Sequence, residues 1–114
     1  MKIEDKLQRI LAVLDAKFVA FVSQTGEVIS SRTKEHAVFP QNVIRNLIKT
    51  IVLTEKEEKA RLKEVLCTGL SSRIAIIHMS HGAIDGFLVV GMKEDFDVLA
   101  MRGVLQQQFG GRNG

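Results

Sequence analysis

The fold of this chain is decided by the stretch KFVAFVS-QTG-EVISS, which spans residues 17–31. Residues 17–23 are apolar on both faces of a strand, and such strands lie in the middle of a sheet. Residues 24–26 predict a tight turn, in which Gly26 supplies the positive φ that short hairpins need. Residues 27–31 return as a shorter and more polar strand, which is typical of a sheet edge. The stretch therefore predicts a hairpin with one central and one edge strand.

Helices and further strands are predicted on both sides of this hairpin. Hydrophobic spacing gives the order α-β-β-α-β-β-β-α. The predicted elements are helices over residues 2–15 and 40–54, strands over 62–68, 73–79 and 83–92, and a last helix from a cap at Asp95 to about residue 109. Residues 55–63 are mostly charged and are interpreted as a solvated connection or a frayed helix end. Gly103, inside the last helix, predicts a close approach to another element. Because tight turns join the strands, we expect a mainly antiparallel sheet and an α+β fold.

Length and composition indicate one globular domain. The chain has 114 residues, of which 46% are apolar and 25% are charged, and these values suit a single folded unit. We expect the domain over residues 1–109 and a flexible tail over 110–114. The six aromatic residues are all Phe, which argues against a sugar- or base-stacking surface. The net charge of +3 is spread over both halves, so no basic arm for nucleic acid is predicted.

The composition also bears on compartment and redox chemistry. The single cysteine, Cys67, excludes an internal disulfide and a cysteine-rich zinc site; we interpret it as a partly buried strand thiol. No apolar run approaches the roughly 20 residues of a membrane span. The first residues carry acids and lack the apolar core of a signal peptide. We therefore expect a cytoplasmic protein without stable membrane insertion.

No catalytic constellation is visible in the sequence. The phosphate-loop, dinucleotide-binding, zinc-protease and nucleophile-elbow motifs are absent. His78 and His81 are three residues apart, which on a strand directs them to opposite faces, and His36 is distant in sequence; a metal site needs more ligands than this. Three carboxylates are interpreted as turn and capping groups: Asp85, Asp95 and Asp97. We predict no catalytic residue, no metal site and no cofactor, and expect a protein that is not an enzyme.

The second predicted helix is more apolar than one sheet face requires. On a projection at 100° per residue from Val43, its apolar side chains span about 180°. Either the same chain covers this whole arc, or the far side of the arc meets another subunit or partner, because exposed apolar patches mark such surfaces. In the second case, the polar residues that border the arc form a rim. These rim residues are Arg45, Asn46 and Lys49.

The hairpin and the late strands together resemble the Roadblock/LC7 family. Its first hairpin commonly has an apolar strand, a glycine turn, two hydrophobic residues and a serine. The matching stretches are residues 18–31, 64–66, 73–77 and 86–91. Thr25 departs from the family pattern, which usually has Asp or Asn before the glycine. The resemblance covers about residues 2–109.

This resemblance implies both an architecture and a function. It implies a five-stranded antiparallel sheet with one helix on one face and two on the other. It also implies homodimers in which the second helices pack together and the third strands pair. The implied interface residues are Val43, Ile44, Leu47, Ile48, Ile51, Val65 and Cys67. Stand-alone prokaryotic members are similar to partners of small Ras-like GTPases. We therefore expect a non-enzymatic homodimeric scaffold that binds such a GTPase and modulates its nucleotide cycle or localisation.

A second class of function stays open beside this one. Small-molecule sensor or adaptor domains that resemble PAS, GAF or profilin-like folds also combine an antiparallel sheet with flanking helices. Such a domain needs a cavity of about 300 Å³ or more with a few convergent polar groups. The predicted apolar strands carry almost no polar groups of this kind, which favours the GTPase-binding module.

Overall fold

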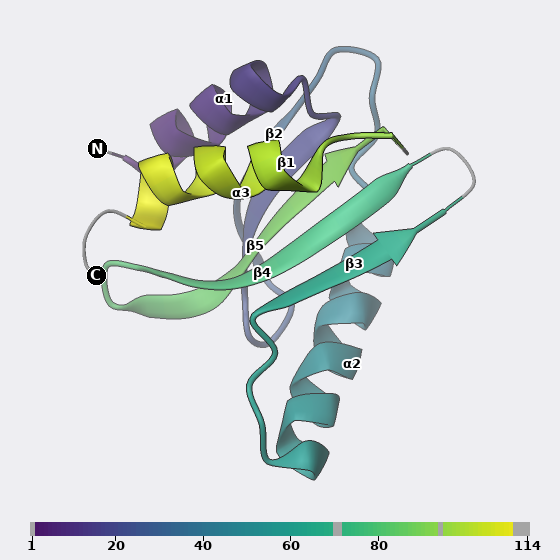
Figure 1. Cartoon of the computed structure of the whole chain (residues 1–114). Helices are drawn as coiled ribbons and strands as arrows, with labels where there is room; N and C mark the ends of the chain where they lie inside the picture. Colours follow the sequence, from purple (N-terminus) through teal and green to yellow (C-terminus); the bar gives the residue numbers. More distant parts are fainter. Residues whose placement is uncertain (1, 70–71, 94, 111–114) are drawn as a thin grey trace.

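The computed structural model describes residues 2–69, 72–93 and 95–110. In these ranges, five strands form one antiparallel sheet with helices on both faces (Figure 1). The elements are α1 (Ile3–Leu14), β1 (Phe18–Ser23), β2 (Val28–Thr33), α2 (Gln41–Glu58), β3 (Glu64–Thr68), β4 (Arg73–His81), β5 (Ile84–Met92), α3 (Val98–Leu105) and the π-helical turn η1 (Gln106–Gly110). The predicted α+β class and element order are confirmed. Residues 111–114, where most of the predicted flexible tail falls, lie outside the described residues.

The strands are ordered β2-β1-β5-β4-β3 across the sheet. The β1–β2 hairpin forms one side, the β3–β4 hairpin forms the other, and β5 pairs with both β1 and β4. β1 is buried along nearly its whole length, as its two-sided apolar pattern predicts, and β2 is an edge strand. β3 forms the opposite edge, so the third strand in sequence is the outermost strand on its side.

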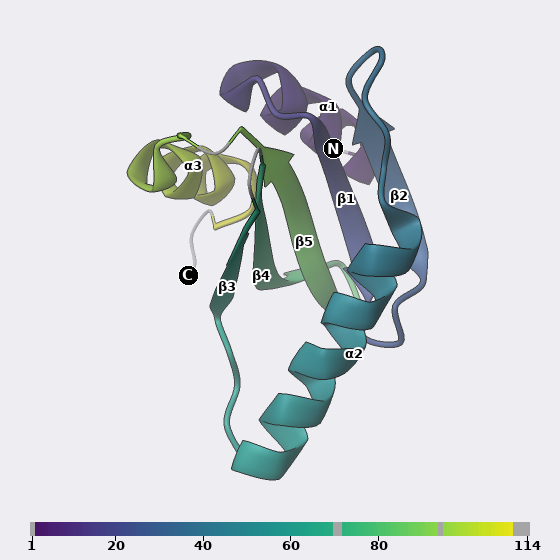
Figure 2. The ribbon, with the colours of Figure 1, turned by 90° about the vertical axis from the view of Figure 1, so that its right-hand side faces the viewer.

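Two apolar cores hold the helices against the two faces of the sheet. Figure 2 shows α2 alone on one side of the sheet and α1 with α3 on the other. The core under α1 and α3 includes Leu7, Ile10, Val19, Leu88, Val90 and Met101. The core under α2 includes Phe18, Ala20, Ile44, Ile48, Ile51, Ile76, Phe87 and Val89. Successive residues of β1 and β5 thus enter opposite cores, because side chains alternate along a strand.

Two local predictions about the helices were wrong, and a third placed a boundary too early. The second helix continues past residue 54 to Glu58, so the charged segment begins as the end of α2, which is one of its two interpretations. Asp97, rather than Asp95, caps α3, because its carboxylate accepts two backbone N–H groups of the first turn. A Cβ added to Gly103 would meet no described atom within 4 Å, apart from its own helix backbone and chain neighbours. The close approach that we predicted at Gly103 is therefore not present in the described part of the chain.

Candidate protein-interaction surface

The first part of the candidate surface is one flank of α2. Ile44, Ile48 and Ile51 are at most 5% exposed and pack on the sheet of their own chain. A partner could not contact these three predicted interface residues unless α2 left the sheet. Beside them, Val43 is 51% exposed and Leu47 is half-buried. The chain therefore covers the centre of the predicted apolar arc and leaves this flank accessible.

The second part of the surface is the free edge of β3. The backbone N–H of His78 donates to the carbonyl of Lys63 at 3.0 Å. Because antiparallel partners alternate, the odd-numbered residues of β3 direct their backbone groups toward β4. The N–H and C=O groups of Glu64, Leu66 and Thr68 consequently face outward from the edge. Leu66 is 40% exposed, and an edge of this kind is a template for another strand.

Val65 and Cys67, the two predicted interface residues of β3, lie on the α2 face of the sheet. Their register partners in β4 are Ile76 and Ile74, and Val65 packs at the margin of the α2 core. Both side chains are half-buried. Burial raises the pKa of the Cys67 thiol, which is the opposite of what an activated nucleophile requires.

The predicted polar rim lies on a different side of α2 from Val43. Arg45 contacts the β1–β2 turn, with its Cγ 3.0 Å from the position that a Cβ would take on Gly26. On the helical projection, Arg45 and Lys49 lie about 200° and 240° from Val43. Both line a surface hollow of about 390 Å³ between the turn and α2. Asn46 is exposed on the outer side of the helix. The cations therefore face the β2 side of the molecule, and the apolar flank faces away from it.

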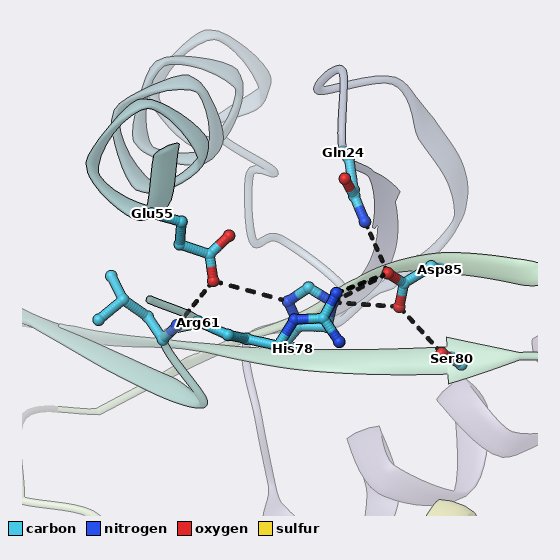
Figure 3. A network of polar contacts seen from close by, with 7 residues as sticks. Gln24, Glu55, Arg61, His78, Ser80 and Asp85 are labelled. Carbon is cyan, nitrogen blue, oxygen red and sulfur yellow. Dashed lines mark hydrogen bonds and ion pairs between the residues drawn. The ribbon is translucent and has the colours of Figure 1, made fainter. Parts of the chain in front are cut away.

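A polar network lies between the end of α2 and the β4–β5 hairpin (Figure 3). The His78 side chain is 8% exposed, and its Nε2 lies 3.0 Å from Oδ1 of Asp85. Its Nδ1 lies 3.9 Å from Oε2 of Glu55 and has no hydrogen-bond partner among the described residues. The ring also contacts Phe87 edge-on, with centroids 4.9 Å apart. A buried imidazole thus stands between two carboxylates.

Both carboxylates have further donors. Those of Asp85 are Gln24 Nε2 at 2.7 Å, Ser80 Oγ at 2.9 Å and Arg61 Nη2 at 3.4 Å. The hydrogen bond from His78 is the largest cause that lowers the pKa of Asp85. Glu55 accepts the backbone N–H of Leu62 at 2.6 Å. The network therefore ties α2, β4, β5 and the segment before β3 to one another.

Sequence reasoning missed this network because it interpreted Asp85 as a turn group. Asp85 lies inside β5, directly opposite Ser80 and diagonal to His78. A hairpin turning at Gly82 places residues 78 and 85 on one face, so this signal was present in the sequence. Ser80 donates to Asp85 and not to His78, so the three residues do not form a serine–histidine–aspartate relay. In the described parts of the chain, no cluster of three His, Cys, Asp or Glu side chains could hold a metal ion.

Three surface hollows bear on the sensor alternative. Their volumes are about 410, 390 and 670 Å³, so volume alone would admit a small molecule. The largest lies beside α3 and is lined by apolar side chains such as Ile77 and Met79. Its two principal charged groups, Glu64 and Arg102, bind each other at 2.6 and 3.0 Å. Volume therefore does not separate the two classes of function.

No protein-family model matches the sequence, and no curated protein matches it. Solved structures do match. MglB of Myxococcus xanthus aligns with a TM-score of 0.76 at 16% identity, over 95% of this chain and 89% of that chain. MglB in a tetrameric arrangement aligns with a TM-score of 0.76 at 14% identity, over 91% and 79%. A Roadblock/LC7 domain from Streptomyces avermitilis aligns with a TM-score of 0.72 at 11% identity, over 95% and 92%.

The architecture defines a three-layer α+β domain with β2 and β3 at the edges of its sheet and a single helix on one face. Its fold is that of the Roadblock/LC7 domains, as the resemblance in sequence predicted. None of the described helices is long and apolar enough to cross a membrane.

Proposed function

We propose that this chain is a non-enzymatic regulatory module that forms a homodimer and, as a dimer, binds a small Ras-like GTPase. The observation that carries the proposal is the accessible surface away from β2. There the described domain presents the free edge of β3, with Leu66, and the apolar flank of α2, with Val43 and Leu47. The Roadblock/LC7 resemblance supports it, because that family pairs through these two elements and has members that serve small GTPases.

The free backbone groups of β3 suggest the register of the dimer. An antiparallel pair centred on Leu66 would place Leu66 opposite its own copy and Val65 opposite Cys67 of the partner subunit. This arrangement uses the outward N–H and C=O groups of β3 and leaves its hydrogen bonds to β4 intact. Both copies of α2 would then lie on the same face of one continuous sheet. Self-association is also consistent with the tetrameric arrangement of MglB, which shares this fold.

The state of the arginines bears on how such a dimer would act on the GTPase. An arginine finger in trans can accelerate hydrolysis by about 10³–10⁵-fold. Of the four candidate arginines, Arg32 contacts the carbonyl of Ser31, Arg61 pairs with Asp85 and Arg73 lies over the ring of Phe96. The fourth, Arg45, forms no side-chain ion pair or hydrogen bond among the described residues. Because three of the four are engaged, we favour the other mode, in which the dimer binds one conformation of the switch loops more tightly and so shifts their population.

Sedimentation velocity on two matched variants tests the dimer. We expect the wild-type chain to sediment as a dimer at micromolar concentration and Val43→Asp to sediment as a monomer, because a carboxylate would lose its hydration in the packed seam. Val13→Asp is the control, since Val13 is 65% exposed on α1 at the opposite face. Ile51→Asp is unsuitable because Ile51 is buried in the protomer and its loss would unfold the chain. A monomeric wild-type protein contradicts the proposal.

Partner binding is tested with the Ras-like GTPase encoded nearest to this chain. The tagged chain is incubated with that GTPase loaded with GDP or with a non-hydrolysable GTP analogue. We expect a complex with the GTP-analogue form that Val43→Asp weakens and Val13→Asp leaves unchanged. Hydrolysis measured in the same mixture separates stimulation from scaffolding. A dimer that captures neither nucleotide state would leave self-association intact and refute the GTPase part of the proposal.

A further inference from the structure

The hollow between the β1–β2 turn and α2 is lined by the charged side chains of Glu27, Arg45 and Lys49. Its volume is about 390 Å³. The residues that line it are Thr25, Gly26, Glu27 and Val28 from the hairpin and Gln41, Arg45 and Lys49 from α2. It lies on the β2 side of α2, away from the apolar flank, and would stay accessible in the proposed dimer.

The two cations of this hollow have no ionic partner in the part of the chain that the structure describes. Within residues 2–69, 72–93 and 95–110, neither Arg45 nor Lys49 forms an ion pair or a hydrogen bond through its side chain. From Gln41 to Thr54, α2 contains no acidic residue that could compensate them. Their positive charge is therefore available to a group from outside.

Arg45 and Lys49 are placed to act on the same ligand. They lie one helical turn apart, and side chains at this spacing are neighbours on the helix surface. The stem of Arg45 packs on the turn, where Gly26 is buried and has a φ of +92°. Any side chain at Gly26 would press on Cγ of Arg45, so the glycine makes room for the arginine as well as for the turn.

The backbone of the turn argues for a carboxylate rather than a phosphate ligand. Loops that cradle phosphate offer free backbone N–H groups. Here the N–H groups of Thr25, Gly26 and Glu27 all donate to Ser23, through its Oγ or its carbonyl oxygen. Recognition is left to the side chains, and a guanidinium pairs well with a planar carboxylate. Glu27, which also lines the hollow, would oppose a doubly charged phosphate more than a single carboxylate.

We propose that this hollow is a docking site for an acidic segment of the protein partner, whose carboxylates bind Arg45 and Lys49. The identity of that partner as a small GTPase rests on the proposed function, but the site itself belongs to each protomer. Charge complementarity makes a specific prediction for Glu27, because its carboxylate competes with the incoming carboxylate for Arg45 and Lys49. Replacing Glu27 should therefore tighten binding, whereas replacing either cation should weaken it.

The test is a titration of the ¹⁵N-labelled full chain with a hexaglutamate peptide, followed by ¹H–¹⁵N spectra. We expect shift changes concentrated at residues 25–28 and 41–49, with none from hexaglutamine. Arg45→Gln and Lys49→Gln should each weaken binding about two- to fivefold, as for an exposed ion pair, and Glu27→Gln should strengthen it. Lys56→Gln is the matched control, because it removes the same charge from an exposed position of the same helix.

Three outcomes would overturn the proposal. The first is an equal effect of Lys56→Gln, which would indicate attraction by net charge alone. The second is a set of shift changes elsewhere on the chain. The third is saturable binding of inorganic phosphate in the hollow without binding of hexaglutamate, which would assign it to another ligand. The Val43→Asp variant, which we expect to be monomeric, can be titrated in the same way. A failure of the dimer is therefore distinguished from a failure of this site.

Discussion

The network around His78 predicts that Asp85→Ala destabilises the domain although the Asp85 side chain is itself 37% exposed. The His78 side chain is 8% exposed, and among the described residues Asp85 supplies the only hydrogen-bond partner of its ring. Removing the carboxylate leaves both nitrogens of the buried imidazole without partners. The remaining lost bonds, from Ser80, Gln24 and Arg61, are exposed and would be replaced by water.

The magnitude follows from which bond is buried. A hydrogen bond to a charged group contributes about 1.5–3 kcal/mol, and the exposed bonds contribute much less. We therefore expect Asp85→Ala to lower the free energy of unfolding by about 2–3 kcal/mol. Ser80→Ala, which removes only an exposed bond to the same carboxylate, should cost about 0.5 kcal/mol or less. In a double-mutant cycle with His78→Phe, most of the Asp85→Ala effect should appear as coupling between the two residues.

Urea unfolding at fixed protomer concentration measures these differences. Hydrogen bonding from His78 lowers the pKa of Asp85 below its usual value of 3.8. A carboxyl with a lowered pKa stabilises the folded state above its unfolded-state pKa, and this stabilisation is lost as pH falls through the folded-state pKa. The gap between wild type and Asp85→Ala should thus be full above about pH 4 and shrink below it. If Asp85→Ala and Ser80→Ala unfold at the same urea concentration at neutral pH, the reasoning is refuted.

Two further predictions concern the glycines and the β3 edge. Gly91→Ala should destabilise the domain by about 2 kcal/mol, because its Cβ would overlap the buried ring of Phe18. Gly103→Ala should instead stabilise α3 by about 0.5–1 kcal/mol, and thermal unfolding measures both changes. Leu66→Cys in a Cys67→Ser background should form a disulfide-linked dimer on mild oxidation, seen on a non-reducing gel, because paired Cα atoms in this register lie about 5.5 Å apart. Dimers that resist cross-linking would argue against a pair centred on residue 66.

Hydrophobic periodicity was sufficient to predict the order of the elements, whereas the layers were implied by the family resemblance. The two-sided apolar pattern of residues 17–23 placed β1 inside the sheet, and the more polar stretch 27–31 placed β2 at an edge. These patterns report burial, which alternates every two residues in strands and every three to four in helices. The same reasoning failed at the ends of elements, as at Glu58 and Asp97, because capping depends on single side chains whose hydrogen bonds no periodicity reveals.

The candidate surface could be predicted only in part, and α2 shows why. Its total apolar content indicated more hydrophobic surface than a sheet face needs, which is correct for Val43 and Leu47. Pattern alone could not tell which residues of the arc meet the sheet, so it included Ile44 and Ile48, which are fully buried in the protomer. That division depends on how the helix is rotated over the sheet. The rotation is set partly by Arg45 against the β1–β2 turn, a contact between segments that lie far apart in sequence.

The polar network also holds the segment that leads into the edge strand β3. The carboxylate of Glu55, near the end of α2, accepts the backbone N–H of Leu62. The backbone N–H of His78 donates to the carbonyl of Lys63. Two residues of the network therefore hold the two residues that precede β3. Leu62 packs at the margin of the α2 core, but the rest of this segment is mostly charged and exposed. The position of the free β3 edge therefore depends on polar groups from α2, β4 and β5 as well as on Leu62. The buried histidine between two carboxylates thus has a structural role beside the edge strand.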